Sequence, residues 1–162
     1  ENSQVAEIVT SWKSVISLLK KENPTLNVFF TVSPVRHIKD GYIENNRSKA
    51  RLLMAVEELQ AESDVYYFPA YEFVLDDLRD YRYFKSDGTH PSPEAVSELW
   101  DFFQSSFFRE DTIELLVNWE QIRQAEQHKI LYPKSQAARK HMENTMKRKA
   151  QFLAAHPTFF LS

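Results

Sequence analysis

Glycine is almost absent from this sequence: Gly41 and Gly88 are the only two in 162 residues, where average usage of about 7% would supply about 11. Phosphate-binding loops of the Walker and dinucleotide types need several closely spaced glycines, so the sequence excludes both. Turn-dense all-β folds rely on glycine at their hairpins and are disfavoured. The hydrophobic share of 43% is nevertheless enough to bury a sizeable core.

Cysteine is missing altogether, which excludes a disulfide scaffold, a zinc finger, an iron–sulfur site and a cysteine nucleophile. No apolar run approaches the roughly 18 to 20 residues that span a bilayer. We therefore expect no membrane association and a cytoplasmic location. The chain begins at Glu1 without a signal peptide, so we expect its start to be a processing or cloning boundary.

Two short apolar segments predict a parallel sheet. Residues 27–33 (NVFFTVS) and 65–68 (VYYF) are β-branched and aromatic without alternation, which is typical of strands buried on both faces. Between them, an apolar stripe predicts a helix over about 46–61, and another predicts a helix from Val5 to Leu19. Strand, helix, strand is a right-handed βαβ unit, so the two strands should be parallel neighbours.

The remainder of the chain is predicted to be helical. Tyr71 to Leu78 indicates one or two turns, and Ser92-Pro93-Glu94 has the cap residue, proline and acid that begin a helix. Two further helices should lie between 111 and 155, separated at Pro133, and the apolar ending from Pro157 should dock on them. We expect an α/β fold with few parallel strands, mostly helical, in two parts: residues 1–108 and a helical extension, 109–162.

Charge is distributed unevenly: residues 1–56 carry +3, residues 57–126 carry −12 and residues 127–162 carry +6. The acidic middle and the basic tail should attract each other. The tail is predicted to be a solvated helix docked on the acidic segment, in preference to a nucleic-acid surface, because no nucleic-acid-binding motif accompanies its charge.

Asp87 and His90 form the most pointed local pattern (DGTH), directly before the helix that begins near Ser92. A carboxylate three residues before a histidine can accept the Nδ1 proton and leave Nε2 free to act as a base toward a serine hydroxyl. The spacing alone favours a simpler interpretation, an Asx turn at Asp87 and Gly88. Both alternatives remain open at this point.

Three separated segments of the chain are TVSPVRH (31–37), YFPAYE (67–72) with LRDYR (78–82), and DGTHPS (87–92). In this order and spacing they resemble the GSCFA family, a bacterial family that looks like a branch of the SGNH/GDSL-type hydrolases. The resemblance covers about residues 5–108. It implies a flavodoxin-like sheet and a serine esterase whose catalytic histidine and aspartate correspond to His90 and Asp87.

The family's nucleophile has no counterpart here, because the chain contains neither a cysteine nor a Gly-Ser dipeptide. We therefore expect the serine and the oxyanion donors to lie upstream of Glu1. This chain would then be the C-terminal part of an ester or acyl hydrolase that acts on small acyl-ester or acetylated substrates. It would need no cofactor, and by itself it should be inactive.

Ser33, Arg36 and His37 follow the first predicted strand, at the edge where ligands bind in open α/β sheets. We assign them tentatively to substrate binding. Arg36 would pair with a substrate anion or, equally, with the acidic middle segment; for His37 a loop-ordering hydrogen bond is favoured over catalysis; Ser33 lacks the surroundings of a nucleophile.

A metal site built from His37, Asp40, Asp87 and His90 is not predicted, because neither pair has a metal-binding spacing. Six aromatic residues are predicted to be core and not a stacking platform: Tyr66, Tyr67, Phe68, Trp100, Phe102 and Phe103. The alternative to an enzyme is a non-catalytic helical module for assembly. Without upstream strands, an unpaired sheet edge and an uncovered apolar face should make this chain self-associate.

Overall fold

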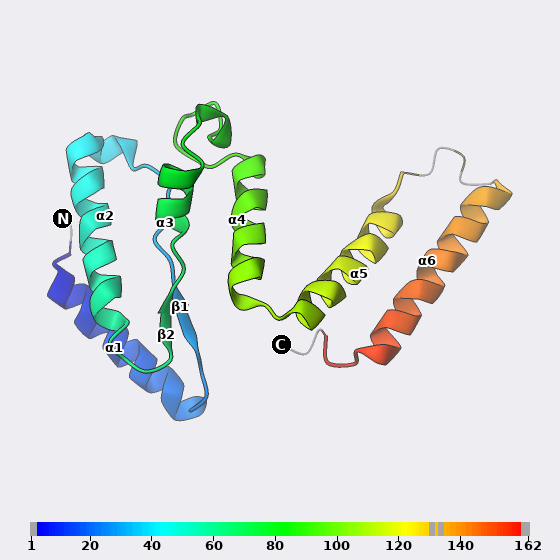
Figure 1. Cartoon of the computed structure of the whole chain (residues 1–162), viewed down its shortest axis with the longest axis horizontal. Helices are drawn as coiled ribbons and strands as arrows, with labels where there is room; N and C mark the ends of the chain where they lie inside the picture. The colour runs from blue at the N-terminus through cyan, green and yellow to red at the C-terminus, as the bar shows by residue number, and fades with distance from the viewer. Residues whose placement is uncertain (1–2, 130–131, 133–134, 160–162) are drawn as a thin grey trace. The chain divides into compact units, whose positions relative to one another are not determined.

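The computed structural model describes residues 3–129, 132 and 135–159 (Figure 1). It divides into two compact units, Glu1–Phe103 and Gln104–Ser162, and each is described by itself. The first unit contains the sheet and the motifs singled out above. The second contains the helical C-terminal region.

The first unit is built on a βαβ unit (Figure 1). Helix α1 (Val5–Glu22) leads into strand β1 (Val28–Phe30), and helix α2 (Gly41–Leu59) connects it to strand β2 (Val65–Tyr67). The strands are parallel, with Val28 opposite Val65. This confirms the α/β class with few strands that the apolar segments predicted, although both strands are shorter than expected.

Helix α2 begins five residues before the predicted start. A 3₁₀ turn, η1 (Ile38–Asp40), leads directly into it, and Gly41 has a φ of 78°. That conformation is open to glycine without steric cost. The residues from 38 to 45, before the predicted start, are therefore helical as well.

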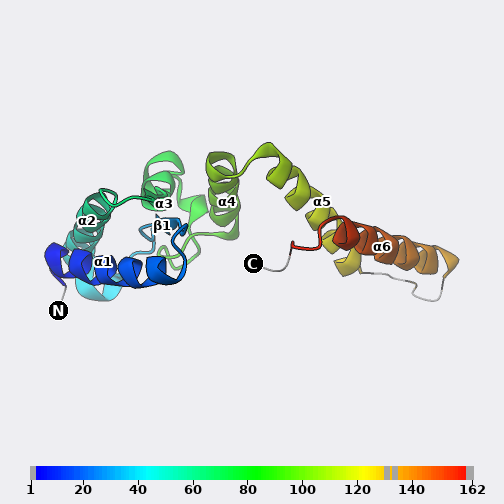
Figure 2. The ribbon, with the colours of Figure 1, turned by 90° about the horizontal axis from the view of Figure 1, so that it is seen from below.

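Helices α1 and α2 cover one face of the two strands (Figure 2). Their common core consists of Val9, Ile16, Ala55, Leu59 and Val65. Leu59 is 1% exposed, so its side chain is completely enclosed by this cluster. Burial of these side chains is what holds the crossover helix against the sheet.

The opposite face of the sheet is partly exposed, so the prediction that both faces of the strands are buried was wrong. Phe29 is 45% exposed and Tyr66 is 42% exposed, and their rings stack on each other with centroids 5.0 Å apart. Trp100, also predicted to be core, is 48% exposed. Continuous apolarity identified the strands correctly, but it cannot tell whether a covering layer is present.

Beyond β2 the chain forms a second small core. Helix α3 (Ala70–Glu72) continues into a π-helical turn, η2 (Phe73–Asp77), and a 3₁₀ turn, η3 (Tyr81–Tyr83), precedes helix α4 (Pro93–Phe107). The core contains Val74, Leu78, Tyr83 and Ala95. Helix α4 begins as predicted, with Ser92 Oγ accepting a hydrogen bond from the Ala95 backbone N–H at 3.2 Å.

The second unit contains helices α5 (Glu110–Gln127) and α6 (Gln136–Ala155), which contact each other. Ile122, Ala138 and Phe152 are buried in this unit, and the Phe152 ring contacts the Trp119 ring. Lys149 of α6 pairs with Glu126 of α5 at 2.8 Å, so basic tail and acidic segment meet here. Phe159 packs on Phe152 and Trp119. Pro133, the predicted break, lies outside the described residues.

Candidate functional site

The segment between Tyr83 and Ser92 is a closed loop. Its ends are joined by backbone hydrogen bonds of 2.8 Å, from Ser92 N–H to Tyr83 C=O and from Lys85 N–H to His90 C=O. Gly88 makes the turn at the tip with a φ of 64°, a conformation that favours glycine. The DGTH motif therefore lies on a defined hairpin-like loop.

The Asp87 carboxylate organises the tip of this loop. Its Oδ1 accepts backbone N–H groups from Thr89 at 2.8 Å and His90 at 3.0 Å. Its Oδ2 lies 2.8 Å from His90 Nδ1. The Asx turn and the contact between carboxylate and imidazole are thus both present, one on each oxygen of Asp87.

These hydrogen bonds set the ionisation of the Asp87 carboxyl. The pKa of Asp87 is lowered to about 2. The largest causes are the hydrogen bonds from the backbone N–H groups of His90 and Thr89, and the hydrogen bond from the His90 imidazole comes next. An ionised carboxylate can only accept, so the Nδ1 of His90 must be the donor. In neutral His90 this places the free lone pair on Nε2, which has no hydrogen-bond partner among the described residues.

The loop after β1 lies beside the Asp87–His90 loop. The Arg36 backbone N–H points to the Thr89 carbonyl and its Nη1 to the Gly88 carbonyl, both at 3.4 Å. Its guanidinium carbon lies 4.7 Å from the centre of the Phe84 ring. Arg36 thus contacts the Asp87–His90 loop in three ways: through its backbone N–H, through its guanidinium nitrogen, and by stacking its guanidinium on the Phe84 ring.

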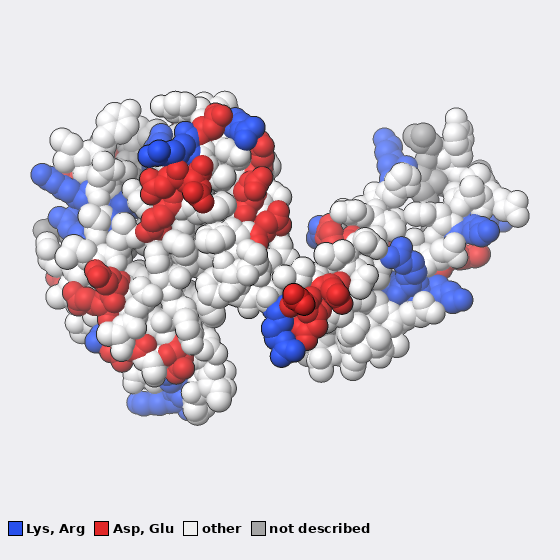
Figure 3. Space-filling model, viewed as in Figure 1, with Lys and Arg blue, Asp and Glu red and all other residues white. Residues whose placement is uncertain are grey.

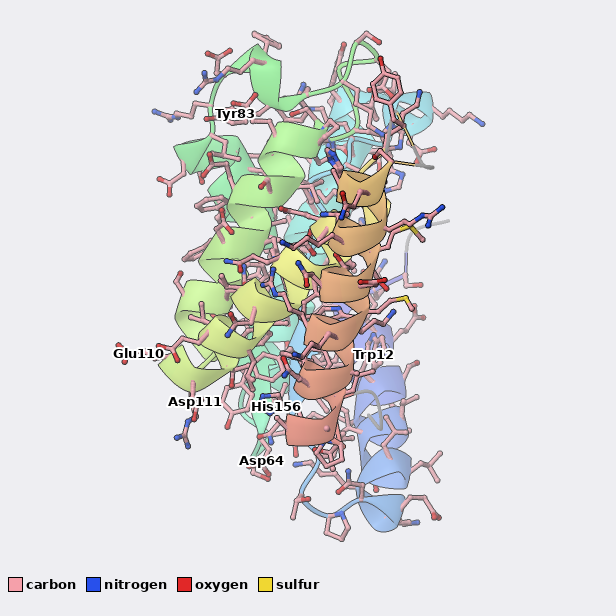
Figure 4. All side chains as sticks on the ribbon, turned by 90° about the vertical axis from the view of Figure 1, so that its right-hand side faces the viewer. Trp12, Asp64, Tyr83, Glu110, Asp111 and His156 are labelled. Atoms are coloured by element: carbon pink, nitrogen blue, oxygen red, sulfur yellow. The ribbon has the colours of Figure 1, made fainter. Side chains whose placement is uncertain are left out.

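A hollow of about 500 Å³ separates the two loops, and His90, Thr89, Arg36 and His37 are among its lining residues. Figure 4 shows Tyr83 and Asp64 at opposite ends of the first unit. The Asp87–His90 loop begins at Tyr83, and Asp64 directly precedes β2. The hollow therefore lies at the carboxyl end of the parallel strands. Ligands of open α/β sheets bind at this end.

The structure brings His37 to this hollow but not Ser33. The His37 backbone N–H donates to Asn45 Oδ1 at 2.9 Å, while Ser33 is not among the lining residues. Ser33 Oγ accepts a hydrogen bond from the Val35 N–H at 3.2 Å. Its hydroxyl is thus part of a turn that shapes the loop.

Lys49 of α2, a residue that the sequence analysis missed, contacts the same loop after β1. It is 3% exposed, and its Nζ donates to the Ser33 carbonyl at 2.6 Å. Desolvation by burial lowers its pKa. The signal was present in the sequence, because Lys49 falls on the inward stripe of α2, seven and ten residues before Val56 and Leu59.

A second polar contact follows β2. The Tyr67 hydroxyl donates to Glu72 Oε2 at 2.8 Å, and burial together with this carboxylate raises the pKa of Tyr67 well above its ordinary range. Both residues belong to the YFPAYE segment. The contact ties the end of β2 to the first turn of α3.

Within the described part of the chain, no group of three or more His, Asp or Glu side chains is arranged to hold a metal ion. None of the described helices is long and apolar enough to cross a membrane.

The model of the GSCFA family matches residues 1–103, which is more than half of the chain. The protein therefore belongs to the GSCFA family. The match spans the strands, the Asp87–His90 loop and most of α4, and leaves α5 and α6 outside it. No curated protein matches the sequence significantly, and no solved structure does either.

Proposed function

We propose that this chain carries the general base of a serine-dependent ester or acyl hydrolase of the SGNH type, with His90 as the base and Asp87 as its orienting carboxylate. The observation that supports this most directly is the 2.8 Å contact between His90 Nδ1 and Asp87 Oδ2. It leaves Nε2 available to take a proton from a hydroxyl.

The proposed reaction is acyl transfer. His90 Nε2 accepts the proton of a serine hydroxyl as its oxygen attacks the ester carbonyl, and then returns the proton to the departing alcohol. Asp87 stabilises the imidazolium that forms between these steps. The low pKa of Asp87 supports this role, because it keeps the carboxylate charged throughout the neutral range.

The nucleophile is proposed to lie outside these 162 residues. Ser33 is bonded within its own turn and does not line the hollow. Thr89 does line it, but its hydroxyl donates to the Asp87 carbonyl at 3.1 Å. Arg36 and His37 would contact the acyl-ester substrate, since they line the same hollow as His90.

The test compares the complete product of the gene with three single variants, using 4-nitrophenyl acetate and butyrate as substrates. We expect His90→Ala to remove most of the activity. Asp87→Asn should lower kcat by orders of magnitude, because the amide NH₂ that replaces Oδ2 favours the wrong imidazole tautomer, while Oδ1 still closes the turn. The 162-residue chain alone should be inactive.

The control is Lys85→Gln, in the same loop. Lys85 contributes its backbone N–H to the loop, and its exposed side chain is not among the lining residues. Its activity should equal that of the unchanged protein. Equal turnover by the unchanged protein and by His90→Ala, on a substrate that the protein clearly cleaves, would contradict the assignment of His90 and the hydrolase proposal with it.

A further inference from the structure

The second unit contains a hollow of its own, unrelated to the family's matched residues. It has a volume of about 740 Å³ and runs between the C-terminal half of α5 and the facing part of α6. This volume is within the range of pockets that hold small molecules. Its lining, among the described residues, contains Lys129, Arg148, His128 and His141 and no carboxylate.

The positive charge in this hollow is not neutralised internally. The nearby carboxylates of α5 are engaged elsewhere: Glu120 pairs with Arg123 at 3.0 Å and Glu126 pairs with Lys149 at 2.8 Å. Among the described residues, neither Lys129 nor Arg148 has a carboxylate within 4 Å. Figure 3 shows further Lys and Arg side chains spread over this unit.

Several polar groups in the hollow are held in place. Arg148 Nη2 donates to Gln121 Oε1 at 3.3 Å, which links the guanidinium of α6 to the side chain of α5. His141 Nε2 lies 3.0 Å from the Ala125 carbonyl, so this nitrogen carries a proton and the Nδ1 side of the ring is free. The His128 ring packs against the His141 ring with centroids 5.6 Å apart.

Two imidazoles this close also suggest a transition metal, and a backbone carbonyl on one ring is a common feature of metal-binding histidines. Two observations argue against that occupant. The described residues supply no third His, Asp or Glu ligand, and the ammonium of Lys129 and the guanidinium of Arg148 would repel a cation. The same groups attract an anion, and an arginine with a lysine is a common pair for oxyanions.

We propose that this hollow is a binding site for a small multivalent oxyanion, bound by Lys129 and Arg148 with the imidazoles of His128 and His141 as further donors when protonated. Phosphate and carboxylate groups share the required chemistry. A site of this kind would give the α5–α6 unit a ligand of its own, whatever reaction the first unit performs.

The experiment is isothermal titration calorimetry of the 162-residue chain with pyrophosphate and, separately, with citrate at matched ionic strength. We expect one ligand per chain, and the tighter of the two identifies phosphate or carboxylate as the preferred group. The variant Lys129→Gln/Arg148→Gln should bind about tenfold or more weakly, because it loses two charged donors.

The matched control is Arg139→Gln/Lys140→Gln. It removes the same two residue types from exposed positions of α6 that do not line the hollow, and it should bind within about twofold of the unchanged chain. Pyrophosphate should also shift the NMR signals of the His128 and His141 rings in the unchanged chain, a readout that does not depend on any variant folding.

Three results would overturn the proposal. The first is absence of saturable binding by either anion. The second is equal weakening by the two double variants, which would indicate general charge attraction. The third is binding of a single-stranded oligonucleotide or of zinc at this hollow when neither small anion binds, since that would assign the hollow to a different class of ligand.

Discussion

The acidity of Asp87 can be tested without any knowledge of the substrate. With a pKa of about 2, its carboxyl would be about 10% protonated at pH 3, whereas at the ordinary value of 3.8 it would be about 85% protonated. The side-chain carboxyl ¹³C signal of Asp87, followed from pH 6 to pH 3 in the folded chain, separates these two cases. We expect it to remain that of a carboxylate at pH 3.

The informative perturbation is His90→Ala. It removes the imidazole but keeps both backbone N–H donors to Oδ1, and these are the larger causes of the low pKa. The pKa of Asp87 should therefore rise but stay below 3.8. Thr89→Ala is the control, because the lost hydroxyl contacts the Asp87 backbone carbonyl and not its carboxylate.

The lowered pKa of Asp87 also makes the stability of the fold depend on pH. Because the pKa is lowered by folding, Asp87 contributes stability above about pH 3.8, and that contribution is lost as the pH falls through about 2. An Asp87 carboxyl that is mostly protonated at pH 3 would refute the loop geometry. A return to 3.8 in His90→Ala would refute the leading role of the backbone donors.

Three further predictions concern folding and assembly. Leu59→Ala should lower the free energy of unfolding in urea by about 2 to 5 kcal/mol, while Met54→Ala, at a 56% exposed position of the same helix, should change it by less than about 0.5 kcal/mol. Gly88→Ala should cost about 1 to 2 kcal/mol through its positive φ alone, and Gly88→Asn less; an equal loss in both would contradict the conformational explanation. We also propose that the chain self-associates through the exposed Phe29–Tyr66 stack, so sedimentation at tens of micromolar should show a dimer that Phe29→Ser/Tyr66→Ser converts to monomer; a monomeric unchanged chain would disprove this.

The local features of this protein could be predicted from its sequence. Strand pairing followed from two unalternating apolar segments around an amphipathic helix, and the start of α4 followed from Ser92 and Pro93. The contact between Asp87 and His90 was also foreseen as one of two alternatives, because a three-residue spacing confines both side chains to one turn. In each case the interacting residues are close in sequence or share a periodic pattern.

The sequence could not supply the particular contacts that join the two loops, nor the degree to which each strand residue is buried. The stacking of Arg36 on Phe84 joins two loops with no common pattern, and it was not among the roles considered for Arg36. The exposure of Phe29 depends on neighbours that its own strand does not specify. The burial of Lys49 could have been predicted, because this residue lies on the apolar stripe of α2, but its charge led to no such prediction.

The two oxygens of the Asp87 carboxylate have different partners, and this constrains which substitutions the position can accept. One oxygen closes the backbone turn and the other contacts the imidazole, so most substitutions at this position would disturb the loop and the histidine together. Asparagine is the exception, since its carbonyl oxygen can still close the turn, and a single nucleotide change converts an aspartate codon to an asparagine codon. Under the proposed function, a lineage released from selection for hydrolysis could therefore lose the orienting carboxylate in one step and retain the loop.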